Sequence, residues 1–224
     1  MIEAVVFDLD DTLYLERDFV RSGFSSVAEK LEDLDIANAT DAFTHLWTQF
    51  ERGRRGDAFD ALARRFPLRG RISVCDLVAH YRTHVPTISP LDHDTMTTVA
   101  GSGMSIGLIS DGLVETQTAK VEALGLQRMF DPFILTGAWG RDFWKPHPRA
   151  FETLETELGI PGSRVAYVAD NPAKDFIAPN RRDWTSIRLR VEGQLHFEAE
   201  ANEPDSHPLT EIQSLAELVE LLRL

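Results

Sequence analysis

The chain has 224 residues, of which 43% are hydrophobic, and this length suits one large domain or a domain that carries a smaller insert. Its formal net charge of −13 argues against nucleic acid or an anionic membrane surface as the main partner. The single cysteine, Cys75, excludes an intramolecular disulfide framework and fits a reducing cytoplasm. We find neither a signal-peptide pattern nor an apolar run of about 18 residues, so we expect a cytoplasmic protein without a membrane span.

The N-terminal stretch joins an apolar run to an acidic cluster. Residues 4–7 are all apolar, and Asp8, Asp10 and Asp11 follow, closed by Thr12. The apolar run predicts a strand buried on both faces, with carboxylates at the end where open α/β sheets bind ligands. In an extended strand Asp8 and Asp10 would point to the same side, and two crowded carboxylates need a cation or a shared proton.

After this cluster the pattern is helical for about 70 residues, a length consistent with a small domain. Apolar residues recur at helical spacing, and Pro86 and Pro90 end the run. We predict a helical insert over residues 15–88, with helices at 17–34, 41–51, 58–66 and 74–84.

Two features of this insert have more than one interpretation. The basic turn with Arg54 and Arg55 would bind a substrate carboxylate or second phosphate if it reached the active site, since arginine matches such groups bidentately. A solvated surface turn is the interpretation we favour. His80 and His84 have a spacing that suits a metal, but no third ligand is near, which favours a structural or surface role.

A second apolar run, 104–109, predicts another buried strand. It ends in Ser110, Asp111 and Gly112, and a helix is expected from 114 to 124. A hydroxyl and free backbone amides at a helix N-terminus bind phosphate well. These three residues are therefore candidates for a phosphate site, although each is also an ordinary turn or capping residue.

Two more strands are predicted, at 133–136 and 164–169. Each is followed by polar residues that are candidates for the site. Lys145 is fixed between Trp144 and Pro146, where its ammonium could neutralise phosphoryl oxygens and carboxylates.

Asp170 and Asp175 follow the fourth strand. These two carboxylates are candidate oxygen ligands for a cation.

The remaining pattern completes an α/β fold. A helix at 148–158, a fifth strand at 184–191, a short edge strand at 210–212 and a final helix at 215–222 are expected. The polar stretch 192–208 is long for a connection, which indicates a mobile or functional segment. Strands that alternate with helices predict a doubly wound parallel sheet that gathers the candidate residues at one edge.

The four polar segments resemble, in order, the four motifs of the haloacid dehalogenase (HAD) superfamily, whose members are mostly magnesium-dependent phosphohydrolases. The first is Asp8-Leu9-Asp10-Asp11-Thr12-Leu13, and Ser110, Lys145-Pro146 and Asp170 to Asp175 carry the others. The resemblance implies a Rossmann-like HAD core at residues 1–14 and 89–224, with the insert at 15–88 as a helical cap. Ala169 stands where the family usually has glycine, which is a small departure.

The resemblance also implies a role for each residue. Asp8 would be the nucleophile that forms an aspartyl-phosphate, and Asp10, held protonated, would be the general acid and base. Mg²⁺ would be held by the Asp8 carboxylate, the Asp10 carbonyl and Asp170. Asp175 would not bind the ion directly but would orient a water molecule or Lys145. Ser110 and Lys145 would hold the other phosphate oxygens.

Three alternatives stay open. Hydrolytic dehalogenases of the superfamily lack the second aspartate of the first motif and need no metal, so Asp10 and Asp170 argue against that activity. A phosphomutase or phosphotransferase shares all four motifs, and a non-catalytic phospholigand-binding protein would be expected to have lost one of them. We expect a small phosphorylated metabolite as the partner, and either a monomer or a homodimer. The Asp170-Asn171-Pro172 and Trp184 region resembles phosphatase-like proteins of sugar and surface-polysaccharide pathways, which implies a phosphosugar.

Overall fold

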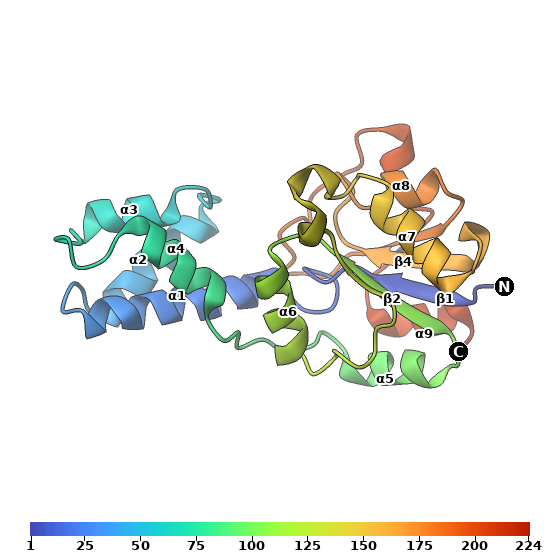
Figure 1. The fold of residues 1–224 in the computed structure, drawn as a ribbon, viewed down its shortest axis with the longest axis horizontal. Helices are drawn as coiled ribbons and strands as arrows, with labels where there is room; N and C mark the ends of the chain where they lie inside the picture. Colours follow the sequence, from blue (N-terminus) through green and yellow to red (C-terminus); the bar gives the residue numbers. More distant parts are fainter. The chain divides into compact units, whose positions relative to one another are not determined.

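The computed structural model describes residues 1–224, which divide into an α/β unit and a helical unit (Figure 1). The α/β unit contains Met1–Arg17 and Ile88–Leu224, and the helical unit contains Asp18–Thr87. The predicted domain limits, after residues 14 and 88, lie close to these limits, after residues 17 and 87. That the two units act as a core and a cap stays a prediction.

A six-stranded sheet forms the centre of the α/β unit, in the order β3-β2-β1-β4-β5-β6. All neighbouring strands are parallel. The strands are β1 Ala4–Phe7, β2 Ser105–Ser110, β3 Phe133–Leu135, β4 Val165–Ala169, β5 Thr185–Leu189 and β6 Thr210–Ile212. This is the doubly wound sheet that the sequence predicts.

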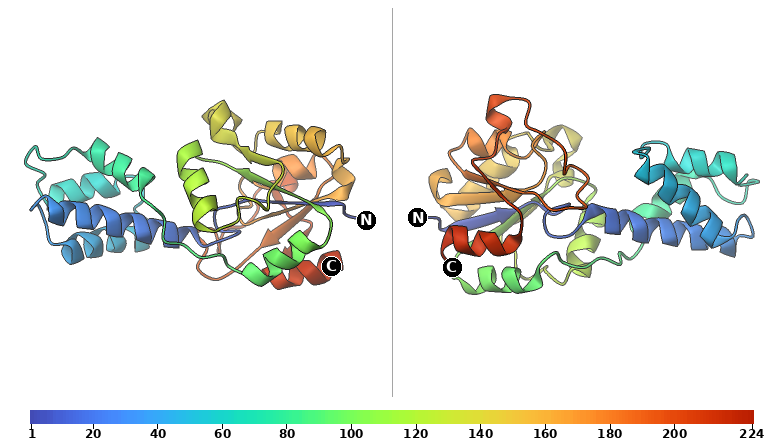
Figure 2. Two further views of the ribbon diagram at one scale, coloured as in Figure 1. Left: turned by 60° about the horizontal axis from the view of Figure 1, so that its bottom comes forward. Right: turned by 180° about the vertical axis from the view of Figure 1, so that it is seen from behind.

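Helices cover both faces of the sheet. The views in Figures 1 and 2 agree in placing α5 and α9 on one face and α7 and α8 on the other. Because chain order runs outward in both directions from β1 and β4, the strand order reverses between these two central strands, which is where such folds bind ligands. The helices of this unit are α5 His93–Gly101, α6 Val114–Ala123, α7 Arg149–Leu158, α8 Ile177–Asn180 and α9 Leu215–Leu222.

The central strands are apolar because both of their faces are covered. Every residue of β1 and of β4 is buried. Behind β4, the rings of Phe151, Tyr167 and Trp184 meet edge to face, with centroids 5.1–6.3 Å apart. This packing holds the strand that leads into Asp170 in a fixed position.

Four helices form the second unit, as the periodicity predicts: α1 Glu16–Asp33, α2 Ala39–Glu51, α3 Ala58–Arg65 and α4 Val74–Thr83. Gly23 lets α1 approach α4, since a Cβ there would lie only 2.5 Å from the Tyr81 ring. Two histidines join the same helices. His84 Nε2 lies 2.6 Å from Ser22 Oγ and His80 Nε2 lies 2.9 Å from Ser26 Oγ, which gives both imidazoles a structural role.

Two helices of the α/β unit have no counterpart in the prediction. Helix α5 carries three threonines and little apolar periodicity, and its start is set by Asp92, whose carboxylate accepts from Thr95 N. Helix α8 has only four residues, one of them Pro179. Predicted strand ends differ by one or two residues; for example, Thr136 begins a 3₁₀ turn instead of ending β3. None of the helices is long and apolar enough to span a membrane.

Candidate active site

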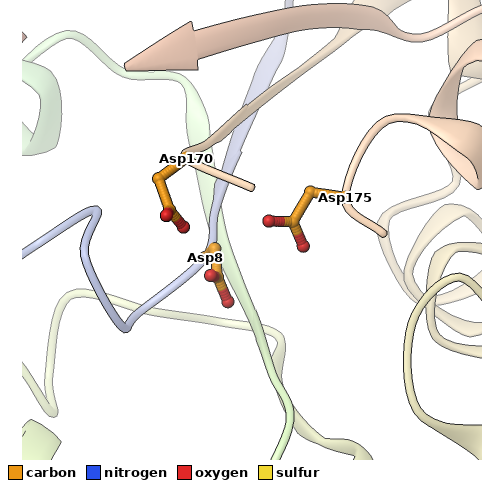
Figure 3. Close-up of side chains that lie close together, drawn as sticks. All are labelled: Asp8, Asp170 and Asp175. Atoms are coloured by element: carbon orange, nitrogen blue, oxygen red, sulfur yellow. The ribbon is translucent and has the colours of Figure 1, made fainter. Parts of the chain in front are cut away.

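Three carboxylates meet where the strand order reverses. Asp8 follows β1 and Asp170 follows β4, and these parallel neighbours end at the same edge of the sheet. The Asp8 amide donates to the Val168 carbonyl at 2.9 Å, which continues the ladder up to the site. Asp175 lies in the loop after Asp170, and Figure 3 shows the three carboxylates close together. One oxygen from each residue lies within 4.8 Å of the others.

Lys145 lies among these carboxylates. Its Nζ is 2.6 Å from Asp8 Oδ1 and 2.8 Å from Asp175 Oδ1, and it donates to the Tyr167 hydroxyl at 3.0 Å. Burial alone would lower the pKa of Lys145, but the charges of Asp175 and Asp8 outweigh it and raise this pKa above its ordinary value. The buried amine therefore stays positively charged beside Asp8.

Asp175 organises the fourth-motif loop. One of its oxygens pairs with Lys145, and the other accepts from the Asn171 amide at 3.0 Å. The Asp175 amide in turn donates to the Asn171 carbonyl at 3.0 Å. Because both carboxylate oxygens are engaged, Asp175 is suited to orienting Lys145, and Asp170 is better placed to bind a cation.

The charges around Asp170 fit a divalent cation. Its Oδ2 is buried without a hydrogen-bond partner, and burial, with the charges of Asp175 and Asp8, raises the pKa of Asp170 well above its ordinary value. The pKa of Asp8 is also raised, to about 6. Burial and the charge of Asp175 raise it, and the charge of Lys145 opposes them. An ion among these oxygens would relieve the repulsion, and a donor set of oxygens alone suits Mg²⁺.

Asp10 has a different set of partners. Its Oδ1 accepts from the Tyr14 hydroxyl at 2.5 Å and from Lys120 Nζ at 2.6 Å, and its Oδ2 accepts from Gln117 Nε2 at 2.8 Å. Burial alone would raise the pKa of Asp10, but the Lys120 charge and the three hydrogen bonds outweigh it and lower this pKa. The expectation that Asp10 is held protonated is therefore wrong for this structure, because its partners favour the carboxylate.

The second-motif residues lie at the end of β2, where Ser110 is buried and Asp111 is half-buried. Ser110 ends the strand, and its Oγ accepts from Gln117 Nε2 at 2.6 Å. The Asp111 carboxylate accepts from Thr136 Oγ1 at 2.7 Å, from the Lys145 amide at 3.1 Å and from Lys174 Nζ at 3.0 Å. Asp111 thus joins the loops of three motifs. Phosphate binding by Asp111 and Gly112, which would use their backbone amides, stays a prediction.

The long polar stretch before β6 is fixed to the first and fourth motifs. The side chain of Arg188 is buried in β5, and it donates to the Asp170 carbonyl at 3.1 Å and to the His196 carbonyl at 3.0 Å. Gln194 Nε2 donates to the Asp11 carbonyl at 2.7 Å. These bonds give the first half of the stretch a defined path beside the site.

Arg54 and Arg55 belong to the helical unit, where both are exposed. The Arg55 guanidinium lies 5.0 Å from the centroid of the Phe50 ring within the same unit. Their contact with a substrate stays a prediction.

The motif analysis missed Tyr14, Gln117, Lys120, Tyr167 and Lys174. One signal was available: the chain has only four lysines, and three of them, Lys120, Lys145 and Lys174, lie at this edge of the sheet. A second signal was the helical spacing of Gln117 and Lys120, which places them on one face of the helix after Ser110.

Comparison with known proteins identifies the family of the chain. Residues 2–181 match the family model of the haloacid dehalogenase-like hydrolases. The chain is 26% identical to the glyceraldehyde 3-phosphate phosphatase of Methanocaldococcus jannaschii, over 100% of this chain and 99% of that protein. It is also 26% identical to the glyceraldehyde 3-phosphate phosphatase of Methanopyrus kandleri, over 100% of this chain and 98% of that protein.

Solved structures share the fold over their full length. The magnesium-bound HAD hydrolase YfnB of Bacillus subtilis superposes with a TM-score of 0.68 at 20% identity, covering 100% of this chain and 99% of that one. The L-2-haloacid dehalogenase of Xanthobacter autotrophicus superposes with a TM-score of 0.61 at 21% identity, with the same coverage.

The family match spans most of the chain, and phosphatases are among its full-length relatives. The chain therefore belongs to the haloacid dehalogenase-like hydrolases.

Proposed function

We propose that this protein is a Mg²⁺-dependent phosphatase that hydrolyses a small phosphorylated metabolite, most simply a phosphosugar, through an aspartyl-phosphate on Asp8. One observation carries the proposal: the buried Lys145 ammonium joins Asp8 to Asp175 beside an Asp170 oxygen that has no partner in the protein. Such a site combines a nucleophile, a fixed positive charge and a place for a cation.

Asp8 is the proposed nucleophile. Its carboxylate attacks phosphorus and displaces the alcohol, and water then hydrolyses the acyl phosphate that forms. Lys145, held by Asp175, neutralises charge on the nucleophile before the reaction and on the phosphoryl oxygens during transfer. When bound by Asp8, Asp170 and the Asp10 carbonyl, Mg²⁺ would neutralise the charge of the phosphate and make it more electrophilic.

Ser110 and Asp10 complete the proposed chemistry. The Ser110 hydroxyl accepts from Gln117, which leaves its own hydrogen free for a phosphate oxygen. Asp10, as a carboxylate, removes a proton from the water that attacks the acyl phosphate. To act as the acid in the first step it must first gain a proton, which the monoanion of a phosphate monoester, with a second pKa of about 6, can bring.

A phosphosugar substrate is supported by the relatives, since three curated proteins similar over nearly the whole chain are named glyceraldehyde 3-phosphate phosphatases. In this proposal the helical unit acts as the cap that selects the substrate. The exposed free thiol of Cys75 fits a reducing cytoplasm.

The test is phosphate release by the purified protein with Mg²⁺ over a panel of sugar phosphates, triose phosphates, nucleotides and phosphoserine. We expect turnover of a short phosphosugar and none by Asp8→Asn. Mutase activity would appear as a positional isomer of the substrate without free phosphate. Full activity after exhaustive chelation, or halide release from 2-haloacids, would instead support a dehalogenase.

A further inference from the structure

Helix α6 supplies two of the three donors that hold Asp10. Lys120 Nζ lies 2.6 Å from Asp10 Oδ1, and Gln117 Nε2 lies 2.8 Å from Asp10 Oδ2. Both side chains are almost fully buried, with 4% and 2% of each residue exposed. Because they are three residues apart on one helix face, a single rigid element places both donors on the two oxygens of one carboxylate.

Gln117 also contacts the second motif. The nitrogen that donates to Asp10 lies 2.6 Å from Ser110 Oγ, and a primary amide has two hydrogens, one for each acceptor. The glycine at Gly112 makes room for this side chain, since a Cβ there would lie 3.0 Å from Gln117 Cδ. One amide therefore joins the general acid and base to the hydroxyl that faces the phosphate.

The chemical type of the residue at position 120 also fits this arrangement. The compact ammonium of Lys120 contacts a single oxygen of Asp10 and lies 5.8 Å from the centroid of the Tyr14 ring. Arginine would bind both carboxylate oxygens with its planar fork and would compete with the transferred proton and with Gln117. A lysine holds one carboxylate oxygen in place and leaves the other to Gln117 and to the transferred proton.

We propose that Lys120 and Gln117 are positioning residues for catalysis, with Lys120 fixing the Asp10 carboxylate for proton transfer and Gln117 placing Asp10 and Ser110 as one unit. This inference rests on the proposed phosphatase function, in which Asp10 exchanges protons with the leaving alcohol and with water. Neither residue touches phosphorus in this account: Lys120 acts through Asp10, and Gln117 acts through both Asp10 and Ser110.

The experiment is a double-mutant cycle between Lys120→Met and Asp10→Asn, read as kcat/KM with Mg²⁺ on an alkyl phosphate and on p-nitrophenyl phosphate. Because kcat/KM reports the steps up to transfer of the phosphoryl group, it isolates protonation of the leaving group. We expect Asp10→Asn to lower kcat/KM on the alkyl ester by about 10²–10⁴-fold. Lys120→Met should lower it by about 10–100-fold alone, a part of the same effect.

Three results identify a positioning role. Lys120→Met should add little loss in the Asp10→Asn background, because its effect passes through Asp10. Its loss should be smaller for p-nitrophenyl phosphate, whose leaving group needs no proton. Lys120→Arg should not restore the wild-type rate. Multiplicative losses in the double variant, or equal losses on both esters, would overturn the inference.

Lys174→Met is the matched control. Lys174 is another lysine at this sheet edge, but it pairs with Asp111 at 3.0 Å instead of Asp10. Its loss should therefore multiply with that of Asp10→Asn.

If Lys120→Met does not fold, Gln117→Leu replaces it in the same cycle. Its losses should be less than multiplicative with those of Asp10→Asn, because only the part that passes through Ser110 should persist. Absence of phosphate release by the wild-type protein would refute the proposed function itself, whereas an active wild type with multiplicative losses refutes only this inference.

Discussion

Asp8 and Asp10 are two residues apart, yet each is paired with a different buried lysine: Asp8 with Lys145 and Asp10 with Lys120, both at 2.6 Å. The pKa of Asp8 is raised by burial, against the effect of Lys145, to about 6. For Asp10, the Lys120 charge and the hydrogen bonds from Lys120, Tyr14 and Gln117 together outweigh burial and lower the pKa. Opposite shifts in neighbouring carboxylates are typical of sites that assign them different tasks. In the proposed function, this contrast would separate the nucleophile, Asp8, from Asp10, the group that exchanges protons.

Asp8→Asn should abolish turnover and keep the fold. The amide has nearly the same volume, and Lys145 retains its ion pair with Asp175 at 2.8 Å, so no buried charge loses its last partner. Single-turnover assays should show no phosphoenzyme, while the melting temperature without metal stays within a few degrees of the wild type. Hydrolysis at a near-normal rate would rule out the covalent route.

Asp170→Asn should remove metal binding and stabilise the metal-free protein. Asp170 Oδ2 is buried without a partner next to Asp8 and Asp175, so a neutral amide relieves repulsion worth about 1–3 kcal/mol of unfolding free energy. Melting in EDTA should occur at a higher temperature, and the increase that Mg²⁺ causes in the wild type should disappear. A variant that is less stable in EDTA and still gains from Mg²⁺ would contradict this account.

The apparent affinity for Mg²⁺ should fall as pH drops below about 6. The pKa of Asp8 is raised from 3.8 to about 6, so below that pH a proton competes with the ion for the carboxylate. Calorimetric titrations should show roughly a tenfold loss per pH unit for each displaced proton.

The stability of the metal-free protein should depend on pH in the opposite direction to the Mg²⁺ affinity. Folded Asp8 binds its proton more tightly than the unfolded chain does, so the free energy of unfolding should decrease as pH rises from 3.8 through about 6. Urea titrations in EDTA across this range measure the trend, and an affinity and a stability that both stay constant would contradict the raised pKa.

Arg54→Ala combined with Arg55→Ala tests whether the basic turn of the helical unit contacts the substrate. If it binds a distal anionic group, KM for the natural substrate should rise by the equivalent of about 1–3 kcal/mol, the value of a charge-assisted contact. A small ester such as p-nitrophenyl phosphate should be nearly unaffected.

Arg64→Ala with Arg65→Ala is the control, because these arginines are also exposed in the helical unit and remove the same charge. Equal changes in both pairs, or none in either, would show that the turn is only a solvated surface.

The sheet could be predicted from the sequence because its central strands are covered on both faces. β1 and β4 are unbroken apolar runs, and the polar residues that end them are the motif residues Asp8 and Asp170. Helix α5 was not predictable in this way, since its three threonines give little periodicity and its first turn depends on the Asp92 cap.

The partners of Asp10 could not be deduced from local pattern. Lys120 and Gln117 are 110 and 107 residues from it along the chain, and only the tertiary fold brings α6 beside the segment that follows β1. For this reason the motif did not reveal the donors that favour the carboxylate form of Asp10, whose catalytic role stays a prediction. Lys145 was easier to assign, because the prolines and aromatic residues around it already marked a fixed position.

The bonds made by Arg188 and Gln194 also determine where the chain could be opened by engineering. Arg188 donates to the carbonyls of both Asp170 and His196, and Gln194 donates to the Asp11 carbonyl. An insertion into residues 192–197 would therefore shift two motif loops. Asn202 is exposed and lies further along the chain than the residues that make these hydrogen bonds. A peptide tag or a fluorescent-protein insertion at Asn202 should leave the catalytic edge undisturbed, which makes this position the natural handle for immobilising or labelling the enzyme.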